Sequence, residues 1–277
     1  MSMPGRTGGF SDVRSLLEGV RTGAMSVDQA LSLFPLLQIH QLDDFARLDL
    51  GRATRKGVPE VIFSPGKSDE AFVAIVQAFV GDGGVALAAR VTPARAALVE
   101  RALGGAPVAE NPTAAVCTYH EQAGTLVAAA AGYVPPSGRG VVGIISAGTA
   151  DVSAAEEAGM VATHMGCRVL RAHDVGVAGV HRLLEPLADM VAEGVQVLVV
   201  AAGMEGALPS VVAGLVDIPV IGLPTSTGYG MGGAGTAALL SILQTCTPGL
   251  VAVNIDNGVG AGAAAGLIAR GQAGQRS

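Results

Sequence analysis

The residues of this sequence that can do covalent or acid–base chemistry stand in short, glycine-rich segments of its second half. Glu205 lies between two glycines, directly before a predicted helix. Its carboxylate either complements the dipole of that helix or, where water is excluded, serves as a general base. Cys246 stands near a predicted helix end, beside a Pro-Gly turn. Free cysteines are more often inert and buried than nucleophilic, so the residues alone leave both roles open.

Two further segments combine polar groups with small residues. In the first, which begins at Ser146, Gly148 permits close backbone approach and the Thr149 hydroxyl stands at a helix N-terminus that can bind an anion. A plain helix cap by Thr149 or Asp151 explains the same residues equally well. In the second, residues 173–182, glycines and alanines surround an acid, an arginine and two histidines. A lone histidine is usually structural, but this clustering favours a site; the candidates are Asp174, His181 and Arg182.

The last polar segments follow the last two predicted strands. Residues 224–235 contain many glycines and several hydroxyls, which predicts a flexible loop that covers a ligand. Thr225 and Ser226 would then contact phosphate or sugar, although a long surface loop is the simpler alternative. After the final strand come three polar candidates, Asn254, Asp256 and Asn257.

Five strand–helix repeats must position these segments. Strands are predicted at 141–146, 168–172, 195–201, 220–223 and 250–254, and helices at 152–165, 180–192, 208–215, 236–243 and 261–269. This alternation predicts a doubly wound parallel sheet of α/β class with right-handed crossovers. Ligands bind beyond the carboxyl ends of the strands in such sheets, so we expect the polar segments to meet there.

The first half predicts a smaller and less regular α/β unit. One or two short helices, with Ser26 as a cap, precede a charged stretch that carries Arg52, Arg55 and Lys67. Strands are then predicted at 60–63, 85–89 and 115–118, and helices at 68–80 and 92–103, the latter capped by Thr92. The segment 132–138 is the best linker candidate, so we predict domains at 1–137 and 138–277.

Composition excludes several classes of protein. The 277 residues are 50% hydrophobic with a mean hydropathy of +0.50, yet no apolar run reaches the roughly 20 residues of a membrane-spanning helix. The first residues lack the apolar core of a signal peptide, and three cysteines without CxxC spacing favour a reducing, cytoplasmic location. We interpret Cys117 and Cys167 as core residues. A net charge of −6 argues against a nucleic-acid surface.

Several stretches together carry a resemblance to a known family. SAGTADVSAAEEA, DVGVAGVHRL, AAGMEGALPSVVAGLVDIPVIGLPTSTGYG and VNIDNGVGAG, with RATRKGVPEVIF nearer the start, resemble the LarB family, the pyridinium-3,5-biscarboxylic acid mononucleotide synthases of nickel-pincer cofactor synthesis. The resemblance spans residues 45–270. The second half is similar, more distantly, to PurE, the aminoimidazole ribonucleotide carboxylase/mutase. Two positions depart from the LarB pattern: Ala150 replaces a serine, and Leu50-Gly51 replaces a more polar pair.

The LarB resemblance implies a reaction on nicotinic acid adenine dinucleotide. Carbon dioxide, or bicarbonate as its source, carboxylates C5 of the pyridinium ring, and hydrolysis of the phosphoanhydride releases AMP. Cys246 falls on the position of the catalytic cysteine, whose thiolate would add to C4 and make C5 nucleophilic. Glu205 is the candidate base that removes the C5 proton. The similarity to PurE further implies a homo-oligomer, an octamer by analogy.

The remaining roles are assigned by charge and hydrogen-bonding capacity. His181, Arg182, Arg52, Arg55 and Lys67 would meet the phosphates and carboxylate of the substrate. Thr149, Asp151, Ser226 and Asp256 would hold ribose, phosphate or a divalent metal bound to the phosphates. No tight metal-ligand spacing occurs, so Mg²⁺ is expected to arrive with the substrate. Two alternatives stay open, namely a PurE-type mutase, against which Cys246 and the extra N-terminal half count, and a non-catalytic nucleotide-binding module.

Overall fold

The computed structural model describes residues 13–33, 39–42, 46–49, 51–81, 84–104 and 115–273, and the chain forms two compact units, Met1–Glu60 and Val61–Ser277. The first unit contains α1 (Val13–Arg21), α2 (Val27–Leu33), β1 (Ile39–Leu42), β2 (Ala46–Asp49) and α3 (Arg52–Lys56). β1 and β2 pair antiparallel. The predicted cap at Ser26 is confirmed, because its hydroxyl accepts the Gln29 N–H at 3.1 Å while the Gln29 side chain accepts the Ser26 N–H at 2.8 Å.

The second unit begins with a four-stranded mixed sheet. Its elements are β3 (Val61–Phe63), α4 (Asp69–Gly81), β4 (Val85–Ala89), α5 (Pro93–Ala102), β5 (Val116–His120) and β6 (Thr125–Ala129), with strand order β3-β4-β6-β5. β3 runs parallel to β4, whereas β6 is antiparallel to both of its neighbours. Thr92 caps α5 as predicted, since its hydroxyl accepts the Arg95 N–H at 3.3 Å.

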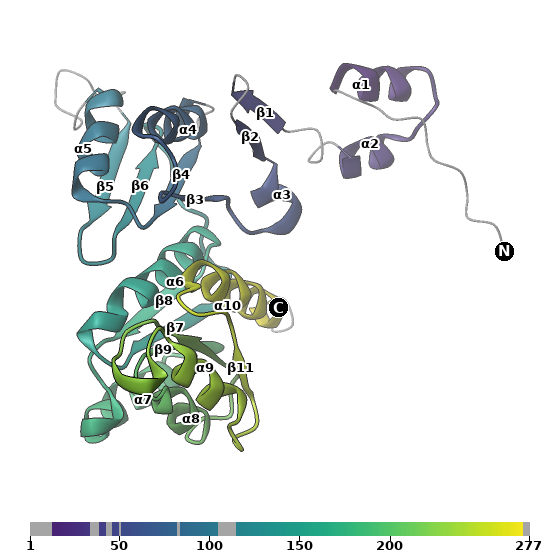
Figure 1. The fold of residues 1–277 in the computed structure, drawn as a ribbon. Coiled ribbons are helices and arrows are strands. Elements are labelled where there is room, and N and C mark those ends of the chain that lie inside the picture. The colour runs from purple at the N-terminus through teal and green to yellow at the C-terminus, as the bar shows by residue number, and fades with distance from the viewer. Residues whose placement is uncertain are drawn as a thin grey trace. The chain divides into compact units, whose positions relative to one another are not determined.

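A five-stranded parallel sheet follows and confirms the predicted doubly wound α/β fold (Figure 1). Its elements are β7 (Val141–Ser146), α6 (Val152–His164), β8 (Arg168–Ala172), α7 (His181–Ala192), β9 (Val197–Ala202), α8 (Ala207–Ala213), β10 (Val220–Pro224), α9 (Thr236–Leu243), β11 (Leu250–Ala252) and α10 (Gly258–Ala273). The order is β11-β10-β9-β7-β8. The chain therefore reverses its direction of winding between β7 and β9, where the loops after the two strands diverge and leave a crevice.

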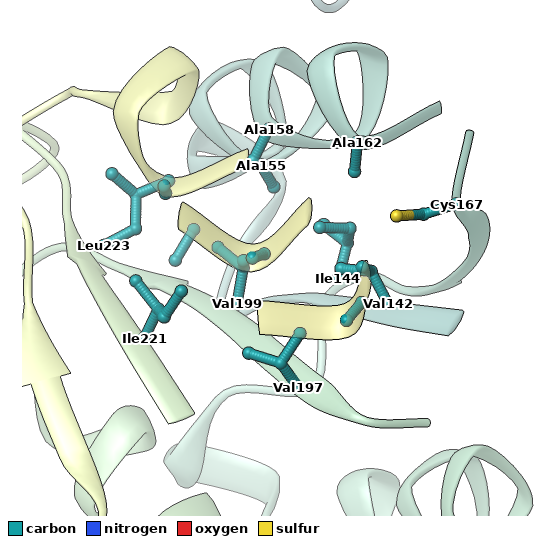
Figure 2. Packing of buried hydrophobic residues seen from close by; sticks show 14 residues of the cluster. Val142, Ile144, Ala155, Ala158, Ala162, Cys167, Val197, Val199, Ile221 and Leu223 are labelled. Atoms are coloured by element: carbon teal, nitrogen blue, oxygen red, sulfur yellow. The ribbon is translucent and has the colours of Figure 1, made fainter. Parts of the chain in front are cut away.

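Helices cover both faces of this sheet because its central strands are apolar on both sides. On one face, Ala155, Ala158 and Ala162 of α6 pack with alanines of α10 against Val, Ile and Leu side chains of β7, β9 and β10 (Figure 2). On the other face, Leu183 of α7 and Leu208 of α8 pack against Ile145 and Val200. The short alanine side chains let α6 and α10 lie close to the strands.

Backbone contact joins α6 to α10. Gly258, Gly262 and Gly266 recur at every fourth position and so lie on one side of α10. A Cβ at Gly258 or Gly262 would lie 2.3 Å from a carbonyl oxygen of α6, that of Ala154 or Ala158. Glycine is therefore required at these positions by the close approach of the two helices.

The structure adds elements that the sequence pattern did not predict, namely β1, β2, α3 and β6. β6 completes a hairpin with β5 and forms the centre of the mixed sheet together with β4. The predicted linker at 132–138 leads from β6 to β7, that is, from one sheet to the other within the second compact unit. The domain boundary at 137/138 stays a prediction.

Candidate active site

A cavity of about 400 Å³ lies at the carboxyl ends of the parallel strands, and its wall includes both sides of the crevice between β7 and β9. This volume falls within the range of roughly 300–1,000 Å³ that small-molecule sites occupy. The loops after β7, β8, β9 and β10 all contribute to its wall. Six of the residues predicted from the sequence line it: Gly148, Thr149, Asp151, Asp174, Arg182 and Glu205.

Asp151 ties two of these loops together. Its side chain is nearly buried, and one carboxylate oxygen accepts the Gly148 N–H at 2.9 Å. The other oxygen accepts the buried Thr225 hydroxyl at 2.5 Å. Asp151 thus closes the turn after β7 and also fixes the end of β10, whereas its side chain makes no N-cap hydrogen bond to α6. Thr225 does not itself line the cavity.

Asp174 and Arg182 supply a charged pair to the cavity. Arg182 Nη1 lies 2.9 Å from Asp174 Oδ2, and both side chains are about half exposed. Asp174 follows β8 with a φ of 59°, a left-handed conformation that non-glycine residues rarely adopt. Such strain concentrates at functional sites, where the surrounding structure holds it. His181 begins α7 next to Arg182 but is exposed and does not line the cavity.

Glu205 lies on a tight turn after β9. Met204 has a φ of 50° and Gly206 a φ of 63°, so left-handed residues flank Glu205 on both sides. The Met204 N–H donates to the Thr227 carbonyl at 2.8 Å, which joins this turn to the loop after β10. Glu205 is exposed and lines the cavity, so its carboxylate is accessible to a bound molecule for proton transfer.

A polar network that sequence reasoning missed lies at the ends of β7 and β8. The fully buried Ser146 hydroxyl lies 2.9 Å from His173 Nδ1, and His173 Nε2 lies 3.0 Å from Glu156 of α6. Arg171 in turn donates to Glu156 at 2.9 Å. Both ring nitrogens of His173 have partners, so this network fixes the ends of β7 and β8. Ser146, predicted to bind substrate, contributes to this framework and does not line the cavity.

His173 and Glu156 also line a second cavity of about 430 Å³, beside the turn between β5 and β6. The mixed sheet therefore contributes to the surroundings of the network. The signal available in the sequence was the position of His173 directly after a strand, but its partners are 17 and 27 residues away along the chain. Such distant pairs cannot be inferred from local spacing.

The polar residues after β11 form a turn that contacts the loop after β10. Asp256, with a φ of 55°, accepts the Ser226 N–H at 2.7 Å and donates its own N–H to the Pro224 carbonyl at 2.9 Å. Asn257 donates its N–H to the Asn254 carbonyl at 3.1 Å and caps α10 through Gly260. These predicted residues lie at the carboxyl edge, as expected, but outside the wall of the cavity.

Cys246 lies at the opposite edge of the sheet. It follows α9 and precedes β11, and Gly249, three residues later, accepts the N–H of Val220, the first residue of β10, at 3.0 Å. β9, with six residues, spans about 20 Å at ~3.3 Å per residue, so roughly this distance separates the edge of Cys246 from that of Glu205. Cys246 is exposed, whereas Cys167 is buried and Cys117 is half-buried. One chain by itself therefore does not bring Cys246 and Glu205 together.

The predicted cations of the first half belong to two compact units, Arg52 and Arg55 to the first and Lys67 to the second. Lys67 Nζ donates to the Phe63 carbonyl at 2.8 Å and so closes its own turn. In the first unit, Arg52 begins α3 and is exposed, and Arg55 forms a two-pronged ion pair with Asp49. Their assignment to substrate phosphates stays a prediction.

Within the described ranges, no three side chains of the His, Cys, Asp and Glu types are grouped so that they could hold a metal ion. Among the described helices, none combines enough length and apolarity to cross a bilayer.

Comparison with known proteins gives matches over most of the chain. Residues 39–129 match the LarB/PurE-like N-terminal domain, and residues 141–275 match the AIR carboxylase domain. The second match includes the cavity and the whole parallel sheet. A relative from Methanocaldococcus jannaschii, described as uncharacterized protein MJ0165, is 39% identical over 259 residues, covering 94% of this chain and 97% of the relative.

Proposed function

Because the chain belongs to the family that joins a LarB/PurE-like N-terminal domain to an AIR carboxylase domain, we propose that it is a carboxylase of nicotinic acid adenine dinucleotide. Carbon dioxide is added at C5 of the pyridinium ring, and hydrolysis then releases AMP. The product is pyridinium-3,5-biscarboxylic acid mononucleotide, a precursor of the nickel-pincer cofactor.

The observation that carries this proposal is the cavity at the carboxyl edge, with an accessible carboxylate and a guanidinium in its wall. Arg182 complements an anionic group of the dinucleotide, since guanidinium–phosphate pairs are strong, charge-assisted contacts. At the turn that leads into α6, Thr149 offers its hydroxyl to phosphate or ribose, and Gly148 permits close approach of the ligand to the backbone. Glu205 supplies the base.

The chemistry requires a nucleophile as well as a base, because an electron-poor pyridinium cannot attack carbon dioxide. The Cys246 thiolate adds to C4, and this C–S bond converts the ring into a neutral dienamine. C5 then attacks carbon dioxide and forms the new C–C bond. Glu205 takes the C5 proton, the electron pair re-forms the aromatic ring, and the C–S bond breaks to release the thiolate.

Since Cys246 and Glu205 lie at opposite edges of one sheet, the mechanism needs two chains at each site. Cys246 of one chain enters the cavity of another, in a homo-oligomer. Exposed apolar side chains near Cys246 support such an interface: Leu240 and Leu243 on α9 and Val251 on β11 are each more than half exposed. Apolar side chains gathered on a surface favour association.

Mass spectrometry of the protein incubated with nicotinic acid adenine dinucleotide, bicarbonate and Mg²⁺ tests the proposal. The expected products are AMP and a mononucleotide that carries one carboxyl group more than the mononucleotide released by hydrolysis alone. Glu205→Gln should slow turnover and let the ring adduct accumulate on Cys246, whereas Glu185→Gln, at an exposed position of α7, should not.

The match to the AIR carboxylase domain favours a second candidate, carboxylation of aminoimidazole ribonucleotide. That ring is already electron-rich and needs no thiolate. An untouched dinucleotide together with carboxylation of aminoimidazole ribonucleotide, unaffected by Cys246→Ser, would replace the first proposal. Binding of the dinucleotide without any turnover, unchanged in Cys246→Ala, would instead identify a nucleotide-binding module.

A further inference from the structure

Arg90, which the proposed chemistry does not use, reaches from the mixed sheet to the parallel sheet. It follows β4 directly and has a φ of 57°, a strained conformation for a side chain of this size. Its guanidinium lies 5.3 Å from the centroid of the Phe63 ring at the end of β3. Nη2 donates to the Asp256 carbonyl at 2.7 Å, and Nε lies 3.5 Å from a carboxylate oxygen of Glu157.

Glu157 is a buried acid whose counter-charge comes from Arg90. Its side chain on α6 is only 4% exposed and lies against the first residue of α10, where a Cβ at Gly258 would be 2.7 Å from Glu157 Cβ. Burial raises the pKa of Glu157 to about 7, although the Arg90 guanidinium lowers it. A buried carboxylate left without a partner is strongly destabilising, so this pair holds the two sheets in one arrangement.

The contact at Asp256 continues to the cavity through hydrogen bonds. Asp256 accepts the Ser226 N–H, and the next residue, Thr227, lines the cavity. The Thr227 carbonyl accepts the N–H of Met204, which directly precedes Glu205. A continuous path of neighbouring contacts therefore leads from Arg90 to the turn that carries the candidate base.

We infer that Arg90 and Glu157 are positioning residues, which fix the turn after β11 and through Ser226 set the placement of the loops that carry Thr227 and Glu205. They act without touching substrate. The inference about turnover rests on the proposed function, but the placement of the loops is a property of the free protein. The two can therefore be tested separately.

Hydrogen exchange of the free protein is the first measurement. In Arg90→Ala the amide hydrogens of Ser226, Asp256 and Met204 should exchange about tenfold faster, as expected for the loss of a hydrogen bond to a charged group. Arg168→Ala removes a surface pair with Glu193 and is the matched control, which should leave these amides unchanged. Unchanged exchange in Arg90→Ala, or faster exchange spread evenly over β7 and β9, would overturn the inference.

A double variant keeps the inference testable if the Arg90→Ala protein does not fold. Arg90→Ala combined with Glu157→Gln also removes the buried acid that has lost its partner, so stability should recover while exchange at Ser226 and Asp256 stays fast. Arg90→Lys keeps the charge but cannot contact Asp256 and Glu157 at the same time, so its exchange rates should lie between those of wild type and Arg90→Ala. Slow, wild-type exchange in the double variant would show that Arg90 does not hold the turn.

Kinetics with nicotinic acid adenine dinucleotide separate positioning from direct binding. The double variant should lower kcat by about tenfold with little change in KM, because the base is misplaced while the binding groups stay. A raised KM with normal kcat and normal exchange would assign Arg90 to substrate contact and overturn the inference. If the wild-type protein does not turn over the dinucleotide, the proposed function fails, and the exchange measurements still decide the role of Arg90.

Discussion

The three cysteines of this chain differ in their exposure to solvent. Burial raises the pKa of Cys117 to about 11, and burial also raises the pKa of Cys167. Both thiols therefore stay protonated near neutral pH, and protonated thiols are poor nucleophiles. Cys246 is exposed at the end of α9, where a reagent or a second chain can reach it.

We predict that iodoacetamide at mildly alkaline pH modifies Cys246 well before Cys117 and Cys167, and peptide mass spectrometry reports the order.

Cys246→Ser should lower carboxylation by about 10³-fold or more, the scale seen when a covalent nucleophile is removed. Cys117→Ser is the matched control and should keep the activity. Near-normal activity of Cys246→Ser would exclude the covalent mechanism.

Glu157 should make the stability of the protein depend on pH. Its pKa rises from 4.5 to about 7 on folding, so between these values the folded protein binds the proton more tightly than the unfolded chain. The free energy of unfolding therefore falls as pH rises through this window, by about 3 kcal/mol at 1.36 kcal/mol per pKa unit, and levels off above it. The charged groups that face Glu157 are Arg90 and Asp256.

Urea unfolding at several pH values measures this slope. Glu157→Gln should flatten it, whereas Glu185→Gln on α7 should leave it unchanged, because Glu185 is exposed. An equal slope in wild type and Glu157→Gln would mean that other groups titrate in this window.

At the scale of elements, the loops around the cavity are held by close backbone approach as well as by hydrogen bonds. A Cβ at Gly203 would lie 2.3 Å from the Thr227 carbonyl oxygen and 2.8 Å from the Thr225 hydroxyl. Gly203→Ala should therefore push the loops after β9 and β10 apart and destabilise the protein by about 1–3 kcal/mol, as overpacking does. It should also slow turnover, since both loops line the cavity.

Thermal unfolding and steady-state rates test this prediction. Gly81→Ala is the control, because Gly81 ends α4 on the surface and an added Cβ meets no atom within 4 Å. It should be neutral or slightly stabilising, since alanine favours helix more than glycine does. A stable and fully active Gly203→Ala protein would show that the two loops adapt independently.

The strand–helix repeats of the parallel sheet were predictable because each apolar strand and its following helix are specified by local pattern. β7 and β8 begin and end at the predicted residues. β6 was missed because Thr125–Ala129 ends in alanines, which have little strand preference, and its pairing with β4 depends on residues some 40 positions away. Local pattern carries no information about such partners.

The same limit applies to the candidate site. Glu205, Arg182 and Thr149 were predictable because the carboxyl ends of parallel strands meet at one edge. The partners of His173 and the contact of Arg90 with Asp256 were not predictable, since they join segments far apart in sequence. The expectation that the polar segments all meet at the carboxyl ends was wrong for Cys246, because a residue directly before a parallel strand lies at the amino end of that strand.

At the scale of the whole molecule, the separation of Cys246 from Glu205 predicts complementation between chains. Cys246→Ser and Glu205→Gln proteins should each turn over far more slowly than wild type, but hetero-oligomers formed by co-expression should regain up to about a quarter of wild-type activity. This fraction follows because one site in four receives both an intact cysteine and an intact glutamate. Mixtures of separately purified, non-exchanging oligomers are the control.

Absence of any recovered activity in verified hetero-oligomers would mean that both residues act within one chain. Size-exclusion chromatography with light scattering should give a mass above that of the 27.5 kDa chain. A strictly monomeric, active protein would contradict the shared site.

The close backbone contact between α6 and α10 limits which substitutions this sequence can accept. Each of Gly258 and Gly262 is matched to a carbonyl of the facing helix, so a larger side chain is tolerated only with a compensating shift of α6. α6 begins directly after Asp151 and carries Glu156 and Glu157, so such a shift would displace the cavity wall and the contacts of both glutamates at once. Substitutions of Gly258 or Gly262 would therefore impair function and be removed by selection, although neither glycine lines the cavity.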